Sequence, residues 1–266
     1  MEGIKTLIEQ KKASIQASNT KATTTEPMQE QPNLGKPAEP KVKVTCELCG
    51  KDFEVEEWEF SYRKPTAHPE CEEKVRLYKS IGIDKLFWNL PKFIVEPGNQ
   101  DAYKAATEFI ANPTRGLFFF GKAGTGKTHL VAKIAQETKL QTKFVKMAKL
   151  LLELRSNFGG DSWENEKIIE KLSKVELLII DDLGAEKMSD WVAETLYLLI
   201  DERYGNMKPT IITSNFSLEE LEERIGDRIC SRIMAMCRLV RVNTNDYRAK
   251  SIINDRTGRE VTSKNE

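Results

Sequence analysis

Residues 116–134, GLFFFGKAGTGKTHLVAKI, decide the fold of this chain. The segment starts with an apolar run, Gly116 to Phe120, whose lack of polar alternation predicts a strand buried on both faces. A glycine-rich turn follows, and an apolar pattern of helical period begins near Thr128. Strand, glycine turn and helix in this order are the setting in which a phosphate-binding loop works.

The turn matches the P-loop pattern in full, because four residues separate Gly121 from Gly126, Lys127 and Thr128. Its glycines, Gly124 included, let successive backbone N–H groups point at phosphate oxygens, and the helix N-terminus adds a favourable partial charge. In such a loop the lysine reaches the β- and γ-phosphates and the threonine hydroxyl binds Mg²⁺. These residues therefore predict a site for ATP and Mg²⁺.

Strands and helices alternate through most of the remaining chain. Buried strands are predicted at 116–120, 143–147, 176–184 and 209–215, and helices at 128–138, 148–158, 190–205 and 217–237, the last with a break at Gly226. Strands that are nearly all apolar and alternate with helices imply a parallel sheet covered on both faces. The expected fold class is therefore α/β.

Two of these strands end in side chains suited to nucleotide chemistry. Asp181 is predicted to hold Mg²⁺ through water, and Asp182 is the candidate for polarising the attacking water. Many related ATPases have a longer glutamate in place of Asp182, which leaves the role of the shorter side chain open. Asn215 ends the other strand, where it could orient water beside the γ-phosphate or cap the following helix.

Arginines gather late in the chain. Arg228 and Arg232 lie four residues apart and can share one helix face, from which they could reach a neighbour's γ-phosphate or form a solvated basic surface. Residues 228–250 carry five arginines and one lysine against one acid, so DNA contact is a rival use for these side chains. Cys230 and Cys237 are predicted on the same helix as packing residues.

A separate group of residues has the spacing of a metal site. Cys46 and Cys49 are separated by two residues, as are His68 and Cys71, which predicts a tetrahedral Cys₃His zinc site. The segment around them is too short to bury a substantial core, so a bound zinc would supply stability. The alternative is three buried thiols and an unrelated surface histidine.

Composition bounds the class of protein. Lys and Arg together number 41, and Asp and Glu together also number 41, so the chain has no overall positive charge. Any surface that binds nucleic acid must therefore be a local basic patch. No apolar run approaches the roughly 20 residues of a membrane span, and the N-terminus lacks a signal-peptide core, so a cytoplasmic protein is expected. The predicted parts are a flexible tail and linker at 1–41, a zinc module at 42–80, the α/β domain at 81–250 and a C-terminal tail at 251–266.

The motifs together resemble a known family. GKAGTGKTHLV, LLIIDDLGAE, TIITSN, GDRICSRI and DYR are similar to the bacterial replicative-helicase loaders of the DnaC/DnaI type and their transposon-borne IstB relatives, which are AAA+ ATPases. The resemblance covers about residues 81–250. It implies slow ATP hydrolysis stimulated by assembly, and a homo-oligomer or an assembly on the helicase hexamer. The loaders typically lack the C-terminal helical lid of other AAA+ proteins, so no lid domain is expected here.

The resemblance also implies roles for single residues. Lys127 and Thr128 correspond to Walker A, Asp181 and Asp182 to Walker B, Asn215 to sensor 1, and Arg228 and Arg232 to the arginine box. Of the two arginines, Arg232 is the better candidate for an arginine finger.

Partners follow from the resemblance as well. In this family a helical element before Walker B, here 148–172, contacts single-stranded DNA, which makes Lys146, Lys149, Arg155 and Phe158 candidate contacts, although packing would explain Phe158 equally well. A zinc module ahead of the ATPase is similar to the DnaI-type loaders, whose N-terminal domain engages the replicative helicase. The IstB relatives generally lack this module. A transposition ATPase that binds duplex DNA and a transposase is the alternative.

Overall fold

A computed structural model describes residues 40–156, 163–186 and 189–247 of the chain. The chain divides into two units, Met1–Pro40 and Lys41–Glu266, and every element below belongs to the second. Nearly all of the tail predicted at 1–41 lies outside the described residues. The tail predicted at 251–266 lies entirely outside them. Phe158 lies outside them too.

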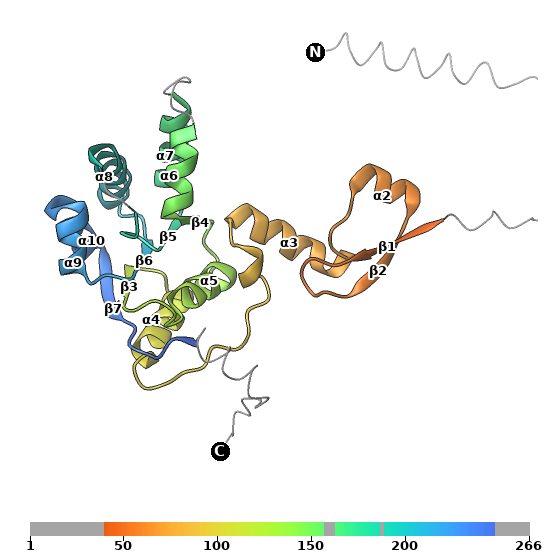
Figure 1. The fold of residues 1–266 in the computed structure, drawn as a ribbon, viewed down its shortest axis with the longest axis horizontal. Coiled ribbons are helices and arrows are strands. Elements are labelled where there is room, and N and C mark those ends of the chain that lie inside the picture. The colour runs from red at the N-terminus through yellow and green to blue at the C-terminus, as the bar shows by residue number, and fades with distance from the viewer. Residues whose placement is uncertain (1–39, 157–162, 187–188, 248–266) are drawn as a thin grey trace, which may run out of the picture. The chain divides into compact units, whose positions relative to one another are not determined.

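A five-stranded sheet forms the centre of the second unit (Figure 1). The strands are β3 (Gly116–Phe120), β4 (Thr142–Lys146), β5 (Leu177–Asp181), β6 (Thr210–Ser214) and β7 (Cys237–Arg241), in the order β4-β5-β6-β3-β7. Every neighbouring pair is parallel. All five residues of β5 and of β6 are buried, as their apolar sequences predict for the middle of a parallel sheet.

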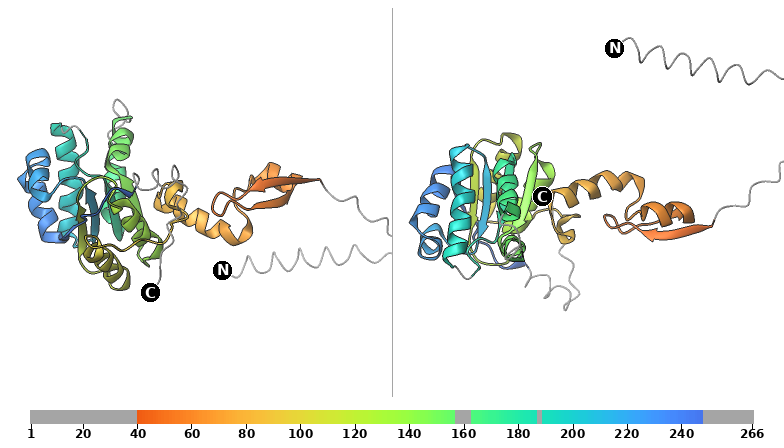
Figure 2. Two further views of the ribbon diagram at one scale, coloured as in Figure 1. Left: turned by 60° about the horizontal axis from the view of Figure 1, so that its bottom comes forward. Right: turned by 90° about the horizontal axis from the view of Figure 1, so that it is seen from above.

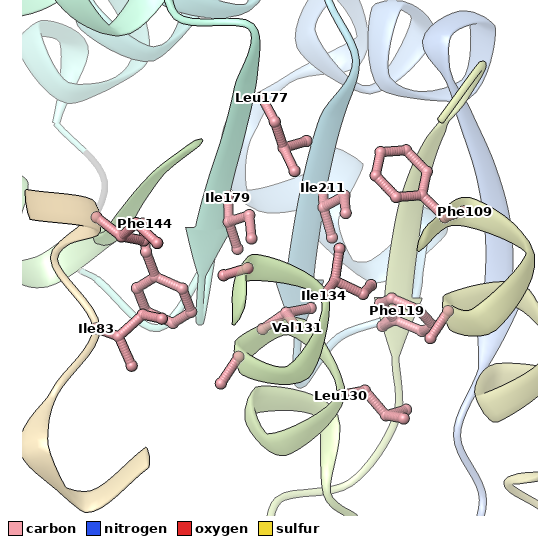
Figure 3. Packing of buried hydrophobic residues seen from close by; sticks show 14 of the residues in the cluster. Ile83, Phe109, Phe119, Leu130, Val131, Ile134, Phe144, Leu177, Ile179 and Ile211 are labelled. Carbon is pink, nitrogen blue, oxygen red and sulfur yellow. The ribbon is translucent and has the colours of Figure 1, made fainter. Parts of the chain in front are cut away.

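Helices cover both faces of the sheet (Figure 2). On one face lie α4 (Gln100–Ala111) and α5 (Lys127–Glu137), and on the other α6 (Met147–Ser156), α7 (Trp163–Lys174), α8 (Asp190–Gly205), α9 (Leu218–Ile225) and α10 (Asp227–Met236). Successive residues of a strand point to opposite faces of the sheet. Phe119 therefore packs under α5, and Phe118 packs in the hydrophobic cluster on the opposite face. Figure 3 shows side chains of α5, Ile134 among them, lying against the sheet beside Ile211.

The predicted elements agree with the structure to within about three residues at their ends, and the main departure is at the C-terminal end of the domain. The helix break at Gly226 is confirmed, since α9 ends and α10 begins on either side of it. The helical prediction to residue 237 was wrong at its last residue, because Cys237 starts strand β7. Only Cys237 and Val240 are buried in β7, so its sequence has no apolar run to mark it as a strand. Cys230 and Cys237 are both buried and free, as expected of packing residues.

The segment ahead of the sheet is a hairpin followed by helices. Strands β1 (Lys41–Thr45) and β2 (Asp52–Glu56) pair antiparallel, and α2 (Glu57–Arg63), α3 (Pro69–Ile81) and the short η1 (Lys85–Phe87) follow. Helix α3 ends at Gly82, whose φ of 94° is left-handed. A Cβ atom at Gly82 would lie 2.7 Å from the carbonyl oxygen of Phe144, so only glycine lets α3 end so close to β4.

Candidate functional site

The phosphate-binding loop joins β3 to α5, as its sequence predicts. Gly124 and Gly126 have left-handed φ angles of 78° and 92°, and Gly126 precedes the first residue of α5, Lys127. The loop borders a cavity of about 680 Å³, a size that suits a small ligand. Lys127, Thr128, Asp181, Asp182 and Asn215 all line this cavity, so the fold brings the predicted nucleotide residues together.

Lys127 lies under the loop and connects it to β6. Its Nζ donates to the carbonyl oxygens of Gly121 and Lys122 at 2.6 and 2.7 Å, and to Oδ1 of Asn215 at 2.9 Å. The lysine is buried, so its charge is not screened by bulk water. An anion that enters the loop therefore meets a concentrated positive charge.

Asp181 lies at the carboxyl end of β5, where two hydroxyls donate to its carboxylate. Thr128 Oγ1 is 3.0 Å and Thr213 Oγ1 is 2.7 Å from Oδ1 of Asp181. Burial raises the pKa of this carboxyl group above its ordinary value, and the two hydroxyls only partly oppose the shift. A cation beside Asp181 and Thr128 would favour the ionised form, and hard oxygen ligands of this kind suit Mg²⁺.

Asp182 and Asn215 form the remaining link in this network. Asn215 Nδ2 donates to Oδ1 of Asp182 at 2.7 Å, while its Oδ1 accepts from Lys127. Asp182 has a φ of 63°, an uncommon left-handed conformation, and its N–H donates to Thr213 Oγ1 at 2.9 Å. The alternative role for Asn215, capping the next helix, is filled by Ser217, which forms a capping box with Glu220.

The two arginines of the predicted arginine box lie on α10 in different surroundings. Arg232 donates from Nε to Oδ1 of Asp201 at 2.5 Å and from Nη2 to the Tyr197 hydroxyl at 2.9 Å. The hydrogen bond to the Asp201 carboxylate and the negative charge of that group raise the pKa of Arg232 above its ordinary value, against a smaller opposing effect of desolvation. Arg228 is exposed, and its guanidinium makes no hydrogen bond or ion pair with another described residue.

The predicted zinc residues converge in the segment ahead of the sheet. One ligand atom from each of Cys46, Cys49, His68 and Cys71 lies within 4.8 Å of all the others. His68 Nε2 is 3.1 Å from the sulfur of Cys49 and 3.6 Å from that of Cys71. Ligands about 2.0–2.3 Å from a tetrahedral zinc would be separated by roughly 3.5–3.8 Å, so the donor set fits that ion in number, type and spacing.

The thiols in this cluster influence one another. Burial raises the pKa of Cys46, but backbone N–H groups of Cys49, His68 and Leu48 outweigh it and bring the pKa down to about 6. Burial and the neighbouring Cys46 and Cys49 raise the pKa of Cys71 to about 11. Adjacent thiolates repel one another, and a dication among them would remove that repulsion.

A comparison with known proteins identifies the family of the nucleotide-binding part. Residues 101–254, more than half of the chain, match the family described as IstB-like ATP binding protein. The chain belongs to this family. This IstB-like protein is 28% identical over 185 residues to the replicative helicase loader DnaC of Escherichia coli (strain K12), a match that covers 66% of the chain and 76% of the relative.

A second relative and a solved structure agree. The IstB-like protein is 29% identical over 179 residues to the replicative helicase loader DnaI of Bacillus subtilis (strain 168), covering 58% of the chain and 56% of DnaI. The crystal structure of a DnaC helicase loader matches with a TM-score of 0.52 at 30% identity, over 63% of this chain and 99% of the other. The predicted AAA+ type of α/β fold is thereby confirmed, and membership of the family supports ATP binding.

Two residues of this IstB-like site lie in the quoted motifs TIITSN and DYR, but the sequence predicted no role for them. Thr213 contacts both aspartates, because its hydroxyl donates to Asp181 and accepts from the N–H of Asp182. Tyr247 lines the cavity from beyond β7, more than a hundred residues after the phosphate loop. Among the described helices, none has the length and apolar character that crossing a bilayer requires.

The cation of Lys127 provides a first test of the nucleotide site. Lys127→Ala should lower ATP affinity on the order of 100-fold, because a hydrogen bond to a charged group contributes about 1.5–3 kcal/mol. Calorimetric titration with ATP measures this change. Lys122→Ala, which alters an exposed side chain of the same loop, should bind like the unchanged protein. Equal affinities for all three proteins would show that Lys127 does not contact the nucleotide.

Metal content tests the Cys₃His cluster. Native mass spectrometry of the gently purified protein should find one zinc per chain, and Cys71→Ser should lose it, because a tetrahedral structural site needs all four ligands. Cys230→Ala, at a buried cysteine on α10 outside the cluster, should keep the zinc. A metal-free unchanged protein would contradict the zinc site.

Proposed function

We propose that this protein is an ATP-controlled loader of a hexameric replicative helicase that also holds single-stranded DNA. The observation that carries the proposal is the likeness to the helicase loader DnaC, which covers 66% of this chain and 76% of that relative. The Cys₃His cluster ahead of the ATPase domain adds a second element suited to docking a partner.

The chain's own residues suggest how ATP would be held and hydrolysed. Lys127 would exchange the Asn215 oxygen for the β- and γ-phosphates. Thr128 and Asp181 would hold Mg²⁺, which would offset the negative charge of the phosphates. The exchange would free Oδ1 of Asn215 from Lys127, while Nδ2 of Asn215 would remain close to Asp182. The freed amide oxygen could then orient a water molecule beside Asp182. Asp182 would accept a proton from that water as its oxygen bonds to the γ-phosphorus, and the bond from this phosphorus to the β–γ bridging oxygen would break to release ADP.

An arginine from a neighbouring subunit would complete this site. The exposed guanidinium of Arg228 is available for a phosphate of another chain, whereas Arg232 would first have to leave Asp201 and Tyr197. We therefore propose a finger role for this pair, in which Arg232 either moves or positions Arg228 through its bond to the Arg228 carbonyl oxygen at 3.0 Å. Both versions require assembly of several chains.

A groove beside the edge strand β4 is the candidate surface for single-stranded DNA. Its volume is about 710 Å³, and its lining includes the lysines Lys143, Lys146, Lys149, Lys171 and Lys174 against the acids Asp84 and Glu153. An excess of lysines along a groove attracts a phosphate backbone without reading its sequence. Lys146 lines both this groove and the nucleotide cavity, so it could couple DNA binding in the groove to nucleotide binding in the cavity.

Arg155 is the remaining predicted DNA contact in the described part of α6, and it lies outside the groove beside β4. The guanidinium of Arg155 is 5.8 Å from the centre of the Trp191 ring on α8. Arg155 does not line the lysine groove. Lys146 and Lys149 are therefore the stronger candidates for DNA contact among the described residues.

The surface for the helicase is proposed on α2. Trp58 and Tyr62 are 58% and 86% exposed, lie four residues apart on this helix, and none of the residues of α2 is buried. Large aromatic side chains left exposed to water, in the segment that carries the Cys₃His cluster, are suited to anchoring a protein partner. The predicted docking module at 42–80 and the flexible tail before it would then tether the ATPase to the helicase.

If the arginines act on a nucleotide bound to a neighbouring chain, the rate of ATP hydrolysis should depend on assembly of the chains. The hydrolysis rate per chain should rise with protein concentration or on addition of helicase and DNA, and Arg228→Ala should lower that stimulated rate by up to about 10³-fold while ATP affinity is kept. Arg238→Ala, at an exposed arginine of β7 paired with Glu108, is the matched control and should hydrolyse ATP normally. A rate per chain that stays constant across dilution and assembly would refute trans action.

Helicase docking through α2 is tested by co-sedimentation with the host's replicative helicase. The double variant Trp58→Ala, Tyr62→Ala should lose helicase association but keep ATP affinity and bound zinc, since neither ring is buried. Leu198→Ala removes a half-exposed apolar side chain of α8 and should associate normally. If the unchanged protein ignores the helicase and instead retains a transposase, the transposition alternative is correct.

A further inference from the structure

The loop after β5 packs directly on helix α9. Gly184, two residues beyond Asp182, has a left-handed φ of 91°. A Cβ atom at Gly184 would lie 2.4 Å from the side chain of Leu221 on α9 and 3.3 Å from the ring of Phe216. A side chain there would be strained and would have to displace Leu221, so glycine lets the loop that carries Asp182 lie against α9.

Arg224 of α9 contacts both this loop and the residue after Asn215. Its Nη1 donates to the carbonyl oxygen of Gly184 at 3.3 Å, and its guanidinium carbon lies 3.9 Å from the centre of the Phe216 ring. Gly184 follows Asp182 by two residues, and Phe216 directly follows Asn215. Arg224 therefore holds the backbone segment behind each of the two side chains proposed to handle the attacking water.

The same two segments are bonded to each other without Arg224. The N–H of Leu183 donates to the carbonyl oxygen of Thr213 at 2.8 Å, and the Ser214 hydroxyl donates to the carbonyl oxygen of Leu183 at 2.7 Å. The N–H of Phe216 donates to the Ser214 hydroxyl at 3.1 Å. Leu183, Thr213 and Ser214 are buried, so water does not compete for the bonds between them. The hydrolytic side chains on these segments are thus held in place independently of Arg224.

Helix α9 leads directly into α10, the helix of the predicted arginine box. Gly226 alone separates the two helices, and its carbonyl oxygen accepts from the N–H of Cys230 at 3.4 Å. Ile225 and Ile229, on either side of the break, are buried in the same apolar cluster as Leu183. Because packed elements shift as units, a displacement of α9 would move α10 with it.

We propose that Arg224 is a positioning residue for Arg228 and Arg232, and that it makes their position depend on the nucleotide bound by their own chain. The proposal rests on the action of this pair on a neighbouring chain. A γ-phosphate that takes Lys127 from Asn215 shifts the segment after β6 and, through its bonds, the loop after β5. Arg224 carries this shift to α9 and α10. It thereby serves the active site of the neighbour and not that of its own chain.

Mixed assemblies of two full-length variants on helicase and single-stranded DNA test this assignment. The acceptor carries Arg228→Ala and Arg232→Ala and keeps its nucleotide site, while the donor carries Asp182→Asn and keeps its arginines. Neither should be stimulated alone, whereas the mixture should hydrolyse ATP at a stimulated rate. Arg224→Ala in the donor should lower that rate about 10-fold, because both contacts that position the arginines are lost. The same change in the acceptor should leave the rate unaltered.

Two further donors and three contrary results complete the test. Arg224→Lys keeps a cation beside the ring and should recover part of the rate, and Arg238→Ala, at an exposed arginine paired with Glu108, should stimulate normally. An equal loss with Arg224→Ala in either chain, or a loss only in the acceptor, would overturn the proposal, since Arg224 would then serve its own site. No loss in either chain would also overturn it. A donor and acceptor that fail to stimulate each other with Arg224 intact would refute the action on a neighbouring chain itself.

Discussion

The hydrogen bonds of Asn215 hold the two halves of the nucleotide site together. Its amide oxygen accepts from Lys127 in the phosphate loop, and its amide nitrogen donates to Asp182 beyond β5. This is possible because β3, β5 and β6 are parallel, so that their carboxyl ends and the polar residues after them meet at one edge of the sheet. An incoming γ-phosphate would compete for the same lysine, so nucleotide binding would alter the contacts of Asn215 and, through it, those of Asp182.

The edge strand β4 offers a physical route from this site to the Cys₃His cluster. Lys146 at its end pairs with Asp84 at 2.5 Å, and Lys143 donates to the carbonyl oxygen of Ser80 at 2.5 Å. Both partners flank the C-terminal end of α3, the helix whose first turn carries Cys71. Because Lys146 also lines the nucleotide cavity, a bound nucleotide can compete with Asp84 for its charge. The same competition would change the lysine groove proposed for DNA.

The sequence predicted those parts that depend on strong local patterns. The glycines and Lys127, the apolar run ending at Asp181 and the cysteine spacing each specify their local structure, and the structure brings each group together. Strand β7 was missed because arginines alternate with its few buried residues. The Asn99–Tyr247 contact was missed because it joins residues 148 positions apart, and neither belongs to a phosphate motif. The pairing of Arg232 with Asp201 depends on how α8 and α10 pack, which helical spacing alone cannot supply.

Control of single-stranded DNA binding by ATP can be measured by fluorescence anisotropy. A labelled single strand and a duplex of equal length are each titrated with the protein in the presence of a non-hydrolysable ATP analogue or of ADP. We expect tight binding of the single strand with the ATP analogue, weaker binding with ADP, and a loss of affinity in Lys149→Ala that shrinks as salt rises. A preference for the duplex, or equal binding of the single strand with both nucleotides, would contradict it.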